Sequence, residues 1–150
     1  MSAIAIQFLR AYFANTTGPT FICSLANEKG RGGEHYIISR DPAAVRKFLL
    51  MWDVAGRSTY YCTGTLKAEA ERIVRPKGSP RCTENIAELV GLHIDVDFKN
   101  VSNEPGDILR QLLSLPLPPT IVVRSGHGWQ GFWLFREPIG TTLGGEVVAV

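Results

Sequence analysis

Hydrophobic and polar residues follow two different periods along this chain. Apolar residues recur every three or four positions near the N-terminus, in the segment after Asp41 and in the segment after Gly106, as expected for helices with one buried face. Asp41 is a good helix-capping residue, and the Pro42 that follows it suits a first helical turn. The pattern predicts helices over Ser2–Ala14, from Asp41 to about Asp53, and from Asp107 to the prolines that begin at Pro116.

Shorter apolar runs, bounded by glycine, proline and other turn residues, predict strands. A glycine-rich turn, Glu28–Gly33, separates the first two predicted strands, Thr20–Leu25 and His35–Ser39. Ser125–Gly128 joins the last two, Thr120–Arg124 and Trp129–Phe135, as a hairpin. Strands and helices do not alternate strictly, so we predict an α+β fold with a central, mostly antiparallel sheet and helices on one face. The predicted strands are Thr20–Leu25, His35–Ser39, Ser58–Thr65, Leu92–Phe98, Thr120–Arg124 and Trp129–Phe135.

Composition adds only broad limits. A chain of 150 residues with 45% hydrophobic and 20% charged residues suits a single domain with an ordinary core. No apolar run is long enough for a membrane span, and the N-terminus lacks a secretory signal pattern, so we expect a cytoplasmic protein without a membrane partner. The net charge of +2 is too small to indicate a nucleic-acid partner by itself. The three cysteines form no CxxC pair and are expected to be reduced thiols.

The strand Leu92–Phe98 carries the first candidate chemistry. Side chains alternate across a strand, so Asp95 and Asp97 share one face, with Cα atoms about 6.5 to 7 Å apart. Two acids on one face of an otherwise apolar strand repel each other unless a cation lies between them. A divalent metal is the simplest such cation, and metals held by carboxylates commonly serve phosphates. The alternative is a pair of solvent-facing charges on an edge strand.

The hairpin that follows offers phosphate contacts. Ser125 and His127 lie among glycines that let a ligand approach the backbone closely, and Arg124 adds a fixed positive charge. The alternative is a plain turn whose glycines serve geometry alone. Upstream, the polar stretch Lys67–Asn85 is either a solvated loop or a contact for nucleic-acid phosphates, and its second half is expected to be mobile. Its basic residues are Arg72, Arg75, Lys77 and Arg81.

Together, the two motifs resemble those of the archaeo-eukaryotic primase superfamily, in particular the primase–polymerase and RepB-like primase domains of plasmids and phages. Leu92–Asp97 resembles the family's metal-holding hDhD strand, and Ser125–Trp133 resembles its Ser-Gly-x-Gly-x-His-x-x-Trp motif. The resemblance extends from about Tyr36 onward. It implies an RRM-like catalytic core in which Asp95 and Asp97 are catalytic and bind Mg²⁺ or Mn²⁺. Nucleotide binding would fall to Arg124, Ser125, His127 and Gln130.

The resemblance implies a DNA primase or polymerase-type nucleotidyltransferase. Such an enzyme uses nucleoside triphosphates on a single-stranded DNA template in plasmid or phage replication, often with a replicative helicase. Two features depart from the family: Gln130 stands where its histidine is usual, and a third acidic motif is missing. Only Glu137 and Glu146 follow the second motif, so residues 1–150 are expected to form one primase–polymerase-like domain that is incomplete at its C-terminus.

Two other functions fit parts of this pattern. The first is a catalytically inactive, nucleic-acid-binding replication module, which the missing third acid favours and the intact Asp95/Asp97 pair disfavours. The second is a metal-dependent glycosyltransferase with a DxD motif, although the chain lacks an obvious nucleotide-binding βαβ unit. A DxD phosphatase is a weaker match, because such enzymes place threonine or valine soon after the acids, where this chain has Phe98-Lys99-Asn100.

Overall fold

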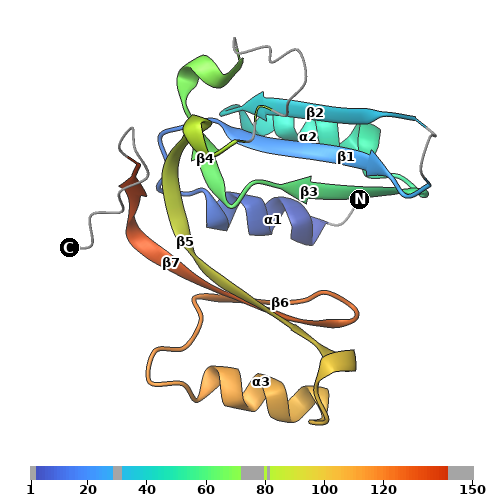
Figure 1. The fold of residues 1–150 in the computed structure, drawn as a ribbon, viewed down its shortest axis with the longest axis vertical. Helices are drawn as coiled ribbons and strands as arrows, with labels where there is room; N and C mark the ends of the chain where they lie inside the picture. The colour runs from blue at the N-terminus through green and yellow to red at the C-terminus, as the bar shows by residue number, and fades with distance from the viewer. Residues whose placement is uncertain (1–2, 29–31, 72–79, 81, 142–150) are drawn as a thin grey trace. The chain divides into compact units, whose positions relative to one another are not determined.

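A computed structural model of the chain describes residues 3–28, 32–71, 80 and 82–141 (Figure 1). The chain divides into two compact units, the first formed by Met1–Val90 with Glu137–Val150 and the second by Gly91–Arg136. The predicted α+β class, with antiparallel strands and flanking helices, is confirmed, but the strands form two sheets instead of one central sheet. Among the described residues, no helix has both the length and the apolar character needed to cross a membrane.

The first unit contains a three-stranded antiparallel sheet in the order β2-β1-β3. Its strands are β1 (Thr20–Ala26), β2 (Glu34–Ser39) and β3 (Arg57–Tyr61). The central strand β1 is apolar on both faces, since Phe21, Ile22 and Cys23 are all buried. A strand with two buried faces needs a layer on each side, and the neighbouring segments of the first unit supply both layers.

Two helices cover the face of this sheet that carries Ile22 (Figure 1). Helix α1 (Ala3–Tyr12) contributes Leu9, and helix α2 (Pro42–Trp52) contributes Phe48 and Leu49. The Asp41 side chain accepts a hydrogen bond from the Ala43 N–H at 2.9 Å and caps α2, as the sequence predicts. Both helices therefore agree with their predicted positions to within two residues.

The opposite face of the sheet is covered by a short strand and a 3₁₀-helix. Leu66 of β4 (Gly64–Leu66) and Ala70 of η1 (Ala68–Glu71) pack against Phe21 and Cys23. The prediction of a single strand over Ser58–Thr65 was wrong, because the segment splits: β3 pairs with β1, whereas β4 pairs with β5 (Ile86–Asp97). All three cysteines are free thiols, as predicted.

Glu88 of β5 ties β4 to the loop before β1. Its carboxylate accepts hydrogen bonds from the backbone N–H groups of Thr17 and Gly18, at 3.1 and 3.0 Å, and from the hydroxyl groups of Thr17 and Thr65. Burial alone raises the pKa of Glu88, but the hydrogen bonds from Thr65, Gly18 and Thr17 outweigh it, and the pKa lies below its usual value. The ionised form is therefore the one that the fold stabilises.

Because the pKa of Glu88 is lowered, we expect the stability of the folded chain to fall in acid. The pKa of Glu88 is lower in the folded chain than in the unfolded chain. The ionised carboxylate therefore contributes its full stabilisation of the fold above the unfolded pKa of about 4.3, and this contribution is lost as pH falls through the folded pKa. Urea unfolding at a series of pH values should therefore show a steeper loss of stability below about pH 4.5 in the wild type than in Glu88→Gln. Equal pH slopes in the two proteins would contradict this account.

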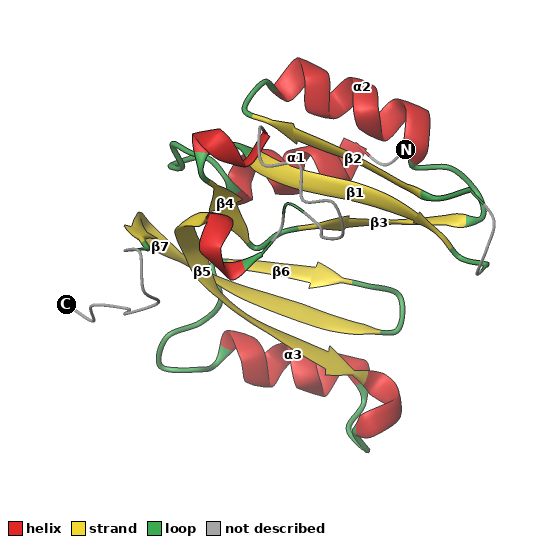
Figure 2. Cartoon of the chain, turned by 45° about the horizontal axis from the view of Figure 1, so that its top comes forward, coloured by secondary structure: helices red, strands yellow, loops and turns green. Residues whose placement is uncertain are grey.

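The second unit is built on strands β5, β7 (Gly128–Gly140) and β6 (Ile121–Arg124), with helix α3 (Pro105–Leu113) on one face (Figure 2). The four-stranded sheet has the order β4-β5-β7-β6. The indole N–H groups of Trp129 and Trp133 donate to the carbonyl oxygens of Pro105 and Leu117, both at 2.8 Å. These bonds, at the two ends of the helical segment, show that α3 covers the tryptophan-bearing face of β7.

Two boundaries in the second unit differ from the predictions. Helix α3 begins at Pro105, two residues before Asp107, because proline is well accommodated at the first helical position. Strand β7 continues to Gly140, beyond the predicted end at Phe135. The predicted strand Leu92–Phe98 corresponds to the second half of β5, and Phe98 instead starts the 3₁₀-helix η3 (Phe98–Asn100).

Candidate active site in the second unit

Contacts between β5 and β7 fix the position of Asp95 in the sheet. The Phe98 N–H donates to the His127 carbonyl at 2.9 Å, and Ile94 Cγ1 lies 3.5 Å from the position that a Cβ at Gly131 would occupy. The strands therefore run antiparallel with Ile94 opposite Gly131, and one step along each strand brings Asp95 opposite Gln130. Paired residues of neighbouring strands share a face, so Asp95 and Gln130 point the same way.

The two faces of this sheet carry different chemistry. Trp129 and Trp133 point to the face that α3 covers, because their indole groups bond to the start of α3 and to the segment after it. Gln130 alternates with them along β7 and points to the opposite face, with its partner Asp95. Asp97, two residues after Asp95, shares that face. We call this side, which carries Asp95, Asp97 and Gln130, the acidic face.

Lys99 places a positive charge beside the carboxylates of the acidic face. Its ammonium Nζ lies 2.8 Å from Asp97 Oδ2, and its backbone N–H donates to Asp97 Oδ1 at 3.2 Å. These two bonds with Lys99 lower the pKa of Asp97, and the nearby His127 adds a smaller lowering. Asp97 and, more weakly, Asp95 raise the pKa of Lys99. Lys99 is not among the residues predicted for this site, although a basic residue two positions after the second acid is a signal in the sequence.

The glycine-flanked turn lies directly beside the acids. The Ser125 N–H donates to the Gly128 carbonyl at 3.0 Å, and Gly126 has a φ of +89°, a conformation that glycine adopts without strain. A Cβ at Gly128 would lie 2.3 Å from the Val96 carbonyl oxygen, so only glycine allows this close contact with β5. Ser125 and His127 are exposed. The turn and the acidic strand therefore form one polar surface.

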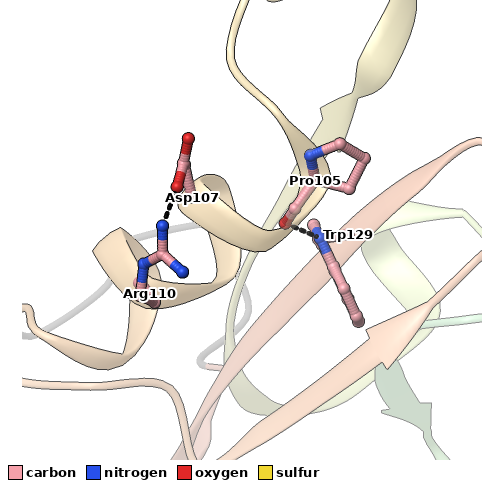
Figure 3. A network of polar contacts seen from close by, with 4 residues as sticks. All are labelled: Pro105, Asp107, Arg110 and Trp129. Atoms are coloured by element: carbon pink, nitrogen blue, oxygen red, sulfur yellow. Dashed lines mark hydrogen bonds and ion pairs between the residues drawn. The ribbon is translucent and has the colours of Figure 1, made fainter.

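Arg124 lies apart from this surface. It pairs with Trp129 across β6 and β7, and its guanidinium Cζ lies 5.8 Å from the centre of the Trp129 ring. The indole of Trp129 bonds to Pro105 at the start of α3 (Figure 3). Arg124 thus shares the face covered by α3, opposite the face that carries Asp95, Asp97 and Gln130.

The oxygen donors of the acidic face suit a hard divalent cation. Mg²⁺ is commonly bound by one or two carboxylates, with water and substrate phosphates completing its shell, so Asp95 and Asp97 fit such an ion. Among the residues that the structure describes, no group of three or more histidine, cysteine, aspartate or glutamate side chains is arranged to hold a metal. Of the two acids considered for a third motif, Glu137 is exposed on β7 and Glu146 lies outside the described residues.

The basic residues proposed to contact nucleic acid, Arg72, Arg75, Lys77 and Arg81, also lie outside the described residues. Comparison of the chain with profiles of known protein families, with curated proteins and with solved structures found no match.

Proposed function

We propose that the chain is a metal-dependent nucleotidyltransferase of the primase–polymerase type. The observation that carries the proposal is the contact between two motifs that are far apart in the sequence. The turn with Ser125 and His127 packs against the strand with Asp95 and Asp97 through the Phe98–His127 hydrogen bond and the close approach at Gly128. Nucleotidyl transfer needs this pairing of carboxylates for metal with polar groups for phosphate.

The residues of the acidic face, the neighbouring turn and Lys99 each have a role in this proposal. Asp95 and Asp97 would hold Mg²⁺ or Mn²⁺, which supplies activation of a 3′-hydroxyl and neutralises charge on the triphosphate. The Ser125 hydroxyl, the His127 imidazole and the Gln130 amide would donate hydrogen bonds to the phosphate oxygens. Lys99 would offset the charge of the carboxylates before the metal binds and would leave Asp97 when it does.

The architecture of the second unit is compatible with an RRM-like core, because β5, β7 and β6 form an antiparallel layer with α3 on one face. The remaining parts of the proposal come from the family resemblance. They are a single-stranded DNA template, nucleoside triphosphate substrates, a replicative helicase partner and a cytoplasmic role in plasmid or phage replication.

Metal-dependent nucleotide binding tests this proposal. A labelled nucleoside triphosphate should bind the wild-type chain more tightly in Mn²⁺ than in EDTA, and Asp95→Ala should lose this metal-dependent gain. Asp107→Ala is a matched control, since it removes an acid of the same unit that is paired with Arg110 on α3 (Figure 3). Equal binding in Mn²⁺ by the wild type and Asp95→Ala, or no gain in binding from Mn²⁺ in the wild type, would contradict the proposal.

The Asp97–Lys99 ion pair favours one alternative, a nucleic-acid-binding replication module without catalysis. In such a module, the ammonium group of Lys99 would take the place of a metal permanently, and Asp97 would only cap the start of η3. This alternative and the enzyme differ in what happens when Lys99 loses its charge.

Lys99→Gln is expected to tighten binding of Mn²⁺ alone by about threefold, because the metal no longer competes with an exposed ion pair. Isothermal titration of Mn²⁺ into the wild type and the variant measures this change. Lys47→Gln, which removes an exposed lysine of α2, controls for the general change in charge. If Mn²⁺ binds to neither the wild type nor Lys99→Gln, the non-catalytic module is the better description.

A further inference from the structure

The first unit contains a cavity that the acidic face does not use. Its volume is about 310 Å³, and it lies between α1, α2 and the sheet of the first unit. Ile22 of β1, Phe13 directly after α1 and Val45 of α2 contribute apolar surface to it. This volume is at the lower end of the range of about 300 to 1,000 Å³ that is typical of small-molecule sites. It suits one compact group better than a long chain.

Three arginines line the same cavity. Arg10 comes from α1, Arg40 follows β2, and Arg46 comes from α2. All three are exposed, and no aspartate or glutamate is among the lining residues that the structure describes. The nearby Asp41 carboxylate is occupied in capping α2, where it accepts the Ala43 N–H. The described part of the lining therefore combines an apolar interior with positively charged arginines.

The hydroxyl groups of the described lining take part in hydrogen bonds of the fold, and Ser39 Oγ accepts the Asp41 N–H at 3.0 Å. Thr20 donates to the Ser39 carbonyl at 3.0 Å, and Thr16 donates to the Phe13 carbonyl at 2.9 Å. Recognition of a polar ligand would therefore fall mainly to the guanidinium groups. Arginine presents several N–H donors in a planar fork that matches phosphate oxygens, so a cluster of three favours a ligand with more than one negative charge.

We propose that this cavity binds a nucleoside phosphate, with the base against the apolar lining and the phosphate on Arg10, Arg40 and Arg46. A planar base fits a compact apolar space, and Phe13 offers an aromatic ring for it. The ligand is either a free nucleotide or one unit of a single-stranded nucleic acid, which share this chemistry. The site uses no residue of the acidic face, so it does not depend on the nucleotidyl-transfer proposal.

Binding measurements in EDTA test the cavity without any contribution from divalent metal. Fluorescence anisotropy would follow a labelled oligothymidylate and, separately, a labelled nucleoside triphosphate. Arg10→Gln, Arg40→Gln and Arg46→Gln are each expected to weaken binding by about tenfold, the usual loss for a charge-assisted hydrogen bond. Lys47→Gln is the matched control, because Lys47 follows Arg46 on α2, is exposed and does not line the cavity. It should change binding by less than about twofold.

Two comparisons identify the source of the ligand and the role of the base. If the free triphosphate binds and displaces the oligonucleotide, the ligand is a nucleotide; if only the oligonucleotide binds, it is a unit of a strand. An abasic oligonucleotide of the same length should bind much more weakly than oligothymidylate. Equal binding of the abasic strand, equal effects of Lys47→Gln and the arginine variants, or no binding in EDTA would each overturn the proposal.

The Asp95→Asn/Asp97→Asn double variant separates this site from the acidic face. It should retain the EDTA-resistant binding while losing the Mn²⁺-dependent binding of triphosphate. Loss of both activities in this variant would show that the cavity does not bind on its own. Retention of the EDTA-resistant binding together with loss of the Mn²⁺-dependent binding would support two separate sites.

Discussion

Asp95→Asn and Asp97→Asn should each reduce template-dependent nucleotide incorporation in Mn²⁺ by at least about a thousandfold, if the acidic face performs nucleotidyl transfer. Asparagine keeps the size of the side chain but removes its negative charge. Because both carboxylates lie on one face and act on the same ammonium group, neither is expected to replace the other. Incorporation on a primed single-stranded template measures the effect.

Asp107→Asn is the matched control, since this acid lies on α3 beside Arg110. It should leave incorporation unchanged. The urea midpoints of the Asp95 and Asp97 variants should also stay close to that of the wild type, because Asp95 is exposed and Asp97 is partly exposed. Full activity of either variant would contradict its assignment as a metal ligand. Nucleotide binding without any incorporation by the wild type would favour the non-catalytic module.

Gly128→Ala is expected to destabilise the chain by about 3 kcal/mol or more and to remove metal-dependent nucleotide binding. A Cβ at this position would lie 2.3 Å from the Val96 carbonyl oxygen and 3.2 Å from Asp97 Cα. The obstacle is backbone, so no side-chain rotation relieves the clash. The strands β5 and β7 would have to separate where the turn meets the acids. Urea unfolding followed by tryptophan fluorescence measures the loss.

Gly106→Ala provides the control for Gly128→Ala. Gly106 lies in the first turn of α3, and a Cβ there would meet no atom within 4 Å. Its φ is also negative, so alanine should be neutral or stabilise the chain by about 0.5 kcal/mol. Equal stability of the Gly128→Ala and Gly106→Ala proteins would show that β5 and β7 do not depend on the close approach at Gly128.

Local patterns explain why much of the secondary structure was predictable. Asp41 with Pro42 marked the start of α2, because capping and a fixed φ act within one helical turn. The position of Asp95 and Asp97 on a strand also followed from the apolar residues between and around them. The prediction of one strand over Ser58–Thr65 failed because the two halves of this segment pair with different strands, which no local pattern records.

The alternation of side chains along β5 follows from backbone geometry alone, so the sequence was sufficient to put Asp95 and Asp97 on one face. Which residues surround them depends on strand pairing and packing between segments that are distant in the chain. That pairing brought Gln130 opposite Asp95 and turned Arg124 toward α3. It also gathered the three arginines of the cavity from separate elements. Such neighbours are set by long-range hydrogen bonds and burial, which a linear pattern does not contain.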